Sequence, residues 1–191
     1  EAVRCCADVL GPDCPNADVY DPDVDIPLSL VYMLQAWTSP QISQLFDMFE
    51  SPTDVCEDCG TEMAAFFRPT QSGPHTFTIA SDDAGHLWFG SSQADADSRP
   101  AIAMVPGWTG IREWHKYRDQ TSDPINLIAG HYYYIRARAR EVERQDNLAV
   151  AMTEPDGTFT GPIPAERSGN YILFAADNRD LDICQPCIPG T

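Results

Sequence analysis

Hydrophobic and polar residues alternate most clearly between His131 and Arg140. Successive side chains on a strand point to opposite faces, so the alternation predicts an antiparallel strand with one apolar face and one solvated face. The same parity places Glu141 on the apolar side, where the loop 142–146 begins. The apolar face comprises Tyr133, Ile135, Ala137 and Ala139, and the solvated face comprises Tyr134, Arg136, Arg138 and Arg140.

Shorter apolar or alternating segments predict further strands, bounded by turns rich in Pro, Gly and Asp. These segments are 63–68, 75–80, 87–89, 101–105, 125–128 and 148–152, with 171–174 as a final strand or apolar anchor. Residues 91–100 predict a polar loop, and residues 109–124 predict a loop with a short strand. Helical spacing of apolar residues at 42–49 favours one short helix. Many short strands with few helices predict an all-β fold, an antiparallel β-sandwich.

The two ends of the chain depart from this pattern. Residues 1–50 and 161–191 are predicted to be irregular arms around a core at about 60–160, within a single domain of 191 residues. Disulfides are expected to join the N-terminal cysteines to the C-terminal pair and to close a small loop at the central pair, leaving one cysteine over. The alternative is a four-cysteine zinc site from the two Cys-x-x-Cys pairs, which lie far apart for such a site. The cysteines are Cys5, Cys6, Cys14, Cys56, Cys59, Cys184 and Cys187.

Charge and motifs narrow the range of functions. The 29 acidic residues outnumber the 12 basic ones, for a formal net charge of -17. Nucleic acids and anionic membranes demand clustered Lys and Arg, so neither is an expected partner. No apolar run approaches the roughly 18 residues of a transmembrane helix, so no membrane insertion is expected. The start at Glu1 fits a piece of a larger secreted protein. No enzyme signature occurs, which predicts a non-enzymatic module.

The pair Asp82–Asp83 stands where a predicted strand gives way to a turn. Adjacent strand residues diverge, so two aspartates that converge need a cation between them. Ca²⁺ takes six to eight oxygen ligands at about 2.3–2.6 Å, and the loop that begins at Glu141 offers more oxygens from Gln145 and Asp146. The alternative is a solvated turn opposite a charged hairpin tip, and the residues alone favour that alternative.

Other side chains near this turn are candidates for ligand contacts. His86 follows the aspartate pair by three residues. Trp88 enters a strand and is expected in the core. Trp108 and Trp114 lie in long loops, where an indole either stacks on a sugar face or packs over the sandwich edge, and packing is the expected role.

Several segments resemble the PA14 domain, in that family's order and near its usual spacing. They are Arg68–Pro69, Gly73–Phe77, Ile79–Asp83, Trp88–Gly90, Val105–Trp108, Arg112–Trp114, Ala129–Ile135, Asp146–Val150 and Pro155–Gly157, which together cover about residues 60–160. The resemblance implies a β-sandwich of a family found in adhesins, glycosidases, toxins and cell-surface proteins.

Carbohydrate-binding PA14 domains hold one Ca²⁺ between a second loop and an aspartate pair joined by a cis peptide, and neighbouring sugar hydroxyls complete the metal's shell. In the family the second loop is commonly glycine-rich, whereas Glu143 and Arg144 here either block the open face of the metal or contact the sugar. The implied metal ligands are Asp82, Asp83, Glu141, Gln145 and Asp146. The implied glycan contacts are Asp82, Asp83, His86, Glu143, Arg144 and Trp108.

The resemblance predicts a Ca²⁺-dependent lectin or adhesin module, extracellular or at the cell surface. Its expected partner is a glycan or cell-surface glycoconjugate, and its expected setting is a larger multidomain surface protein. The alternative is a non-catalytic PA14 module with a structural or protein-interaction role.

Overall fold

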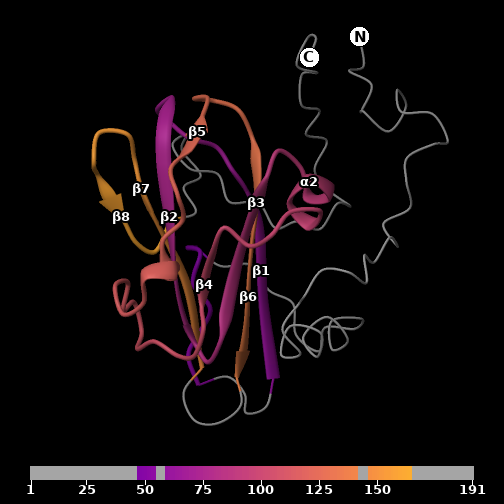
Figure 1. The fold of residues 1–191 in the computed structure, drawn as a ribbon, viewed down its shortest axis with the longest axis vertical. Coiled ribbons are helices and arrows are strands. Elements are labelled where there is room, and N and C mark those ends of the chain that lie inside the picture. Colours follow the sequence, from indigo (N-terminus) through magenta and orange to yellow (C-terminus); the bar gives the residue numbers. More distant parts are fainter. Residues whose placement is uncertain (1–46, 55–58, 142–145, 165–191) are drawn as a thin grey trace, which may run out of the picture. The chain divides into compact units, whose positions relative to one another are not determined.

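The protein folds into two packed sheets. The structure is a computed structural model that describes residues 47–54, 59–141 and 146–164, all within one compact unit of the chain (Figure 1). One four-stranded sheet has the order β1 (Cys59–Phe67), β6 (Tyr133–Glu141), β3 (Gly85–Gly90) and β4 (Ala103–Val105). The other has the order β5 (Ile125–Leu127), β2 (Gly73–Asp82), β7 (Asn147–Thr153) and β8 (Phe159–Thr160). Neighbouring strands are antiparallel throughout, so the predicted all-β antiparallel sandwich is confirmed.

The chain changes sheets at one end of the sandwich. β2 ends at Asp82 in the second sheet, and β3 begins at Gly85 in the first. β6 ends at Glu141 in the first sheet, and β7 begins at Asn147 in the second. The end of β2 and the end of β6 both lie at the lower end of Figure 1. The Asp82–Asp83 turn therefore lies next to the ends of β6 and β7, which follows from the strand order and not from the sequence.

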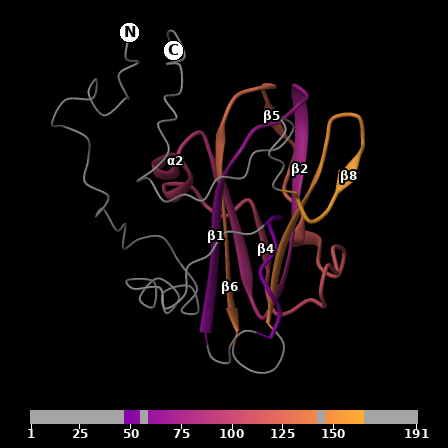
Figure 2. The same cartoon turned by 180° about the vertical axis from the view of Figure 1, so that it is seen from behind.

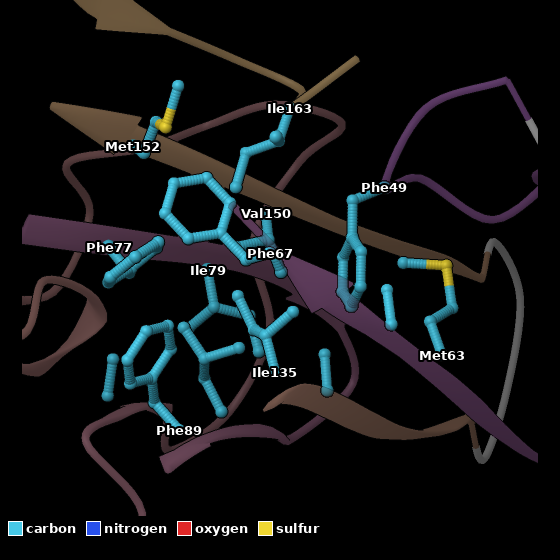
Figure 3. Close-up of a cluster of buried hydrophobic side chains, with 14 of the residues drawn as sticks. Phe49, Met63, Phe67, Phe77, Ile79, Phe89, Ile135, Val150, Met152 and Ile163 are labelled. Carbon is cyan, nitrogen blue, oxygen red and sulfur yellow. The ribbon is translucent and has the colours of Figure 1, made fainter. Parts of the chain in front are cut away.

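Aromatic and aliphatic side chains from both sheets fill the space between them (Figure 3). The rings of Phe67 and Phe77 lie edge to face with centroids 5.4 Å apart, and the centroids of Phe77 and Phe89 are 4.8 Å apart. The core also takes in Phe49 and Ile163, which lie outside the predicted core of 60–160. These two residues are joined by a backbone hydrogen bond from Phe49 N to Ile163 O at 2.7 Å, so the described ends of both arms are anchored against β7.

The arginine face of β6 is not solvated, contrary to the prediction. Arg136 and Arg138 are each 8% exposed and Tyr134 is 2% exposed, whereas Arg140 is half-buried. Arg136 lies over the indole of Trp88 at 4.9 Å and pairs with Asp97 at 2.5 Å. Charge pairing and stacking let the guanidinium groups leave water.

Side chains from β1 and β3 also contact the arginine face of β6, and together they form what we call the arginine layer. Arg138 donates to Glu62, which stands directly opposite it on β1. Trp88 is buried as predicted, but it lies on this outer face and not in the core, because its neighbours Leu87 and Phe89 point inward. His86 stacks on Trp88 with centroids 5.7 Å apart. The result is a second buried layer, made of charged and aromatic groups.

A helix stands where the sequence predicted only a polar loop. α2 (Gln93–Asp97) is capped by Ser92, whose side chain accepts from Asp95 N, and it packs on β3 and β6. Figure 2 shows α2 on the side of the first sheet that faces away from β5, β2 and β8. A Cβ at Gly90 would lie 2.5 Å from Ala96 N, so the strand meets the helix only through a glycine. The helix supplies Asp97 to the arginine layer.

Smaller differences concern the loops. Residues 109–124 contain a 3-10 helix, η2 (Arg118–Gln120), and a single bridge from Thr121 to Thr78 where a short strand was predicted. β8 was not predicted. The described part of the segment 42–49 consists of two bends and one bridge and not of a helix, while its earlier residues and the predicted strand 171–174 lie outside the described residues.

Candidate functional site

The aspartate pair lies at the end of the sandwich where β2 passes to β3. Asp82 is the last residue of β2, and the peptide bond between Asp82 and Asp83 is cis, as the resemblance implied. The turn is fixed by Ser81 Oγ, which donates to Asp83 O at 2.9 Å. A Cβ at Gly85 would lie 2.3 Å from Ser81 Oγ, so only glycine fits after this turn. Local packing thus holds both carboxylates in place.

Glu141 completes a group of three carboxylates. The turn is tied to the end of β6 by hydrogen bonds from Asp83 N to Arg140 O at 2.9 Å and from Arg140 N to Ala84 O at 3.0 Å. One carboxylate oxygen each from Asp82, Asp83 and Glu141 lie within 4.8 Å of one another. Glu141 is 2% exposed, whereas both aspartates are half-buried, so the group is closed on one side and open on the other.

Negative charge is concentrated at this group. Burial, the neighbouring Asp83 carboxylate and a hydrogen bond with it raise the pKa of Asp82 to about 6, and Asp146 adds to the rise. Lys116 opposes it. Two neighbouring carboxylates repel each other when both are ionised. A cation held between them stabilises their charged forms.

The start of β7 adds oxygen atoms to the same corner. Asn147 stands directly opposite Asp82 in the β2–β7 pairing, so the two side chains share a face. Asn147 Nδ2 donates to Thr109 O at 3.1 Å, while Asn147 Oδ1 is buried without a hydrogen-bond partner among the described residues. The sequence prediction missed Asn147, although its place at the start of the return strand, beside the predicted ligand Asp146, was a signal. Asp146 itself is 5% exposed and close enough to Asp82 to raise its pKa.

This donor set fits a hard divalent cation. Ca²⁺ prefers six to eight oxygen ligands, from carboxylates, amide carbonyls and water. Three converging carboxylates and a buried amide oxygen without a partner supply that chemistry, and no His nitrogen belongs to the group among the described residues. The residues present therefore fit Ca²⁺ better than a nitrogen- or sulfur-preferring metal such as Zn²⁺.

Trp108 and His86, the other two predicted glycan contacts that the structure describes, differ in exposure. The sequence analysis expected Trp108 to pack over the sandwich edge, but its side chain is 53% exposed. Lys116 lies over one face of its indole. Trp114 does pack at the edge, with its ring 6.1 Å from that of Phe159. His86 is 7% exposed and stacked on Trp88 in the outer layer, and burial lowers its pKa. Trp108 is thus exposed, whereas His86 is buried in the outer layer of the first sheet.

Other predicted site residues lie outside the described residues. They are Glu143, Arg144 and Gln145 in the second loop, together with every cysteine side chain (Cys59 contributes only the first backbone position of β1). The predicted disulfides and the alternative zinc site remain predictions. No helix in the described part of the chain is both long and apolar enough to cross a membrane.

An antiparallel sandwich with a group of carboxylates at one end is the architecture that the resemblance to the PA14 domain implied. Comparison with known proteins agrees: residues 60–154 match the GLEYA domain family, which confirms the adhesin-type domain implied by the resemblance.

The individual proteins similar to this chain include a flocculation protein and solved adhesin domains. Over 123 residues the chain is 30% identical to Flocculation protein FLO9 of Saccharomyces cerevisiae, a match that covers 61% of this chain and 9% of that protein. The Epithelial Adhesin 9 A domain from Candida glabrata, solved in complex with Galb1-4GlcNAc, is 18% identical with a TM-score of 0.44, covering 62% of this chain and 54% of that one. The PA14 sugar-binding domain from an RTX adhesin is 14% identical with a TM-score of 0.38, covering 53% and 49%. The chain spans less than a tenth of the flocculation protein.

Proposed function

We propose that this domain binds Ca²⁺ through Asp82, Asp83 and Glu141 and, through that ion, a glycan. The observation that carries the proposal is the convergence of three carboxylate oxygens within 4.8 Å at an end of the sandwich that is half open. A bound Ca²⁺ supplies a cation with coordination positions for ligand hydroxyl oxygens. The protein's own part is to hold the carboxylates on a rigid turn and to keep one side of the group accessible.

Each residue of the proposed site has a separate role. Asp82 and Asp83 supply oxygens from the turn, and the buried Glu141 supplies the closed side. Asn147 Oδ1 is a further candidate ligand, because its amide nitrogen is already committed to Thr109 O. Asp146 adds negative charge next to Asp82. Gln145 of the second loop remains a proposed ligand from the sequence, and Glu143 and Arg144 remain proposed glycan contacts.

The adhesin relatives support a non-enzymatic carbohydrate-binding role. The match to a flocculation protein supports a location at the cell surface, within a larger protein. The partner is therefore a glycan or a glycoconjugate of a cell surface. The net charge of -17 argues against anionic polymers as partners unless a cation bridges them.

Isothermal calorimetry with Ca²⁺ alone tests the metal site. We expect one ion per chain in the parent, and at least tenfold weaker binding in Asp82→Asn, Asp83→Asn and Glu141→Gln, since each loses a charged oxygen ligand. Asp123→Asn is the matched control, because Asp123 is exposed and outside the group, and it should bind like the parent. Absence of binding in the parent, or equal binding in all four variants, would sink the metal claim.

A glycan array probed with Ca²⁺ and again with chelator tests whether the domain binds a glycan through the ion. Binding to glycans that is lost with chelator is the expected result. A parent that binds Ca²⁺ but no glycan would instead favour the structural or protein-interaction role.

A further inference from the structure

The two edges of β2 are bound by different parts of the chain. β7 pairs with one edge, and beyond the three residues paired with β5 the other edge is bound by the segment 109–122. The links are hydrogen bonds to alternate carbonyls of the strand, from Ser122 N to Phe77 O at 2.9 Å, from Gln120 Nε2 to Ile79 O at 2.8 Å and from Thr109 N to Ser81 O at 2.7 Å. Alternate backbone groups of a strand point to the same edge, so these links form one row. Thr109 ends the row, next to the Asp82–Asp83 turn.

Thr109 is clamped on Ser81 by its side chain as well as by its backbone. Ser81 N donates to Thr109 Oγ1 at 2.9 Å, and Thr109 Oγ1 donates to Ser81 O at 3.2 Å. Neither residue has any exposed surface. Because Ser81 also fixes the aspartate turn through its bond to Asp83 O, the clamp joins Thr109 rigidly to the strand end that carries the carboxylates.

Asn147 reaches Thr109 from the opposite edge of β2. It is the first residue of β7 and stands opposite Asp82. Its Nδ2 atom donates to Thr109 O at 3.1 Å, so the side chain bridges from β7 to the segment on the other edge of β2. Asn147 is 5% exposed, which leaves its amide little freedom to turn.

This bridge decides which end of the amide faces the carboxylates. A side-chain amide has a donor end and an acceptor end, so the bond from Nδ2 to Thr109 O sets the direction of Oδ1. Oδ1 is buried, and no hydrogen-bond partner for it lies among the described residues. The side chain shares a face with that of Asp82, its cross-strand partner. A buried oxygen without a partner is costly and needs an explanation, and a cation at the carboxylate group supplies one.

We propose that Thr109 is a positioning residue of the metal site: its carbonyl holds the Asn147 amide with Oδ1, and not Nδ2, toward a cation at the carboxylate group. The inference rests on the proposed function. An amide turned the other way would present N–H groups to the ion, so its orientation decides whether Asn147 is a ligand at all. Groups that orient a metal ligand from behind typically change metal affinity by about 10- to 100-fold.

The substitution Thr109→Val tests the clamp, because valine keeps the shape of threonine and loses the hydroxyl that binds Ser81. Calorimetry with Ca²⁺ alone should give about tenfold weaker binding than in the parent. Thr109→Ser keeps the hydroxyl and should bind like the parent. Thr121→Val is the matched control, since Thr121 Oγ1 bonds to Thr78 Oγ1 at 3.0 Å on the same edge of β2 but does not contact Asn147. Equal binding in Thr109→Val and Thr121→Val would overturn the proposal.

The substitution Asn147→Asp separates orientation from charge, and it keeps the test decisive where Thr109→Val does not fold. Affinity for Ca²⁺ rises with the number of charged ligands, so charge alone predicts tighter binding. An aspartate cannot donate to Thr109 O and is repelled by it, hence we expect about tenfold weaker binding instead. Tighter binding in Asn147→Asp would show that Thr109 does not set the geometry of the site.

The metal-free protein gives a measurement that does not depend on the ion. With asparagine labelled by ¹⁵N, the Nδ2 protons of Asn147 should exchange with solvent about tenfold faster in Thr109→Val than in the parent, Thr109→Ser or Thr121→Val. A Thr109→Val variant that is less stable in urea, yet keeps both slow exchange and the parent's affinity for Ca²⁺, would leave Thr109 with a structural role only. That result overturns the proposal and spares the proposed function, whereas a parent that binds no Ca²⁺ overturns both.

Discussion

On the inner face of β6, Ile135 and Ala137 pack among phenylalanine rings from both sheets, whereas on the outer face Arg136 and Arg138 lie between an indole, two carboxylates and a short helix. Both faces are buried. The inner face needs only apolar area removed from water, which is non-directional. The outer face needs each guanidinium to meet a particular partner, because an unpaired buried charge is costly. The alternation in the sequence tells which side chains share a face, and leaves open which face is wet.

The two faces also end differently. The last residue on the inner face of β6 is Glu141, which belongs to the carboxylate group. The last residue on the outer face is Arg140, whose backbone hydrogen-bonds to the Asp82–Asp83 turn. The core side therefore delivers the buried carboxylate, and the strand's backbone fixes the other two.

The largest expected difference between the faces comes from two adjacent phenylalanines on β1. Phe67 points into the core with no exposure and touches three aromatic rings, whereas Phe66 lies on the outer face against Tyr134 at 5.7 Å. Phe67→Ala should lower the free energy of unfolding by about 3–5 kcal/mol, because it leaves a cavity. Phe66→Ala, the matched control, should cost less than half as much in the same urea titration. Equal losses would mean that the outer layer is packed as tightly as the core.

Next in size is the contact through which α2 covers the outer face. Gly90→Ala should destabilise the protein by about 1–3 kcal/mol, since the new Cβ would meet the backbone of Ala96 at 2.5 Å. Gly110→Ala is the control, because its Cβ would meet only side-chain atoms of Glu113 at ordinary distances, from 3.6 Å. Far-ultraviolet circular dichroism with thermal unfolding measures both. A Gly90→Ala variant as stable as the parent would show that α2 can move off the sheet without loss.

Salt should change the stability contributed by the charged outer face, but not that contributed by the apolar core. Arg136→Met should cost about 1 kcal/mol at low ionic strength, because it removes the Asp97 ion pair and the cation–π contact with Trp88. Asp97 is 39% exposed, so salt should reduce this cost, whereas the cost of Phe67→Ala should not change. Arg99→Met breaks an exposed pair with Asp95 and should change stability by no more than about 0.5 kcal/mol. Denaturant titrations at low and high NaCl decide the matter, and a salt-independent loss in Arg136→Met would assign it to packing.

The smallest effect is that of pH on the outer layer. Burial lowers the pKa of His86 below its ordinary value of 6.5, so the folded protein favours the neutral ring. The unfolded chain takes up the proton below pH 6.5, hence the stability contributed by His86 is present above that pH and is lost as the pH falls. The cost of His86→Gln should therefore be smaller at pH 5 than at pH 7.5 in matched urea titrations. A cost that is the same at both pH values would mean that His86 titrates normally in the fold.

The sequence predicted the strands that carry the site because their patterns are local. The turn at Asp82–Asp83, the strand that ends in Glu141 and the return strand after Asp146 all follow from alternation and turn residues. The sequence did not predict β8, because two residues give no periodicity. It did not predict α2, because that segment is polar and its stability comes from the Ser92 cap and from packing on β3.

Among the site residues, Asp82, Asp83 and Glu141 were predicted and the structure brings them together. Asn147 and Thr109 were not, because nothing in a local pattern says that an amide oxygen lacks a partner or that a distant carbonyl will accept from its nitrogen. Such contacts join residues far apart in the chain, and they exist only once the two sheets are packed.

By itself the sequence determined the alternation of β6, the positions of the turns and the excess of carboxylates, since these depend on neighbouring residues and on composition. The tertiary structure alone decided that the arginine face is largely buried, that Trp108 is exposed with Lys116 over its ring, and that the Asp82–Asp83 turn and the end of β6 bring three carboxylates together. The physical reason is that burial and charge pairing are set by what packs against a side chain, and that partner comes from another strand.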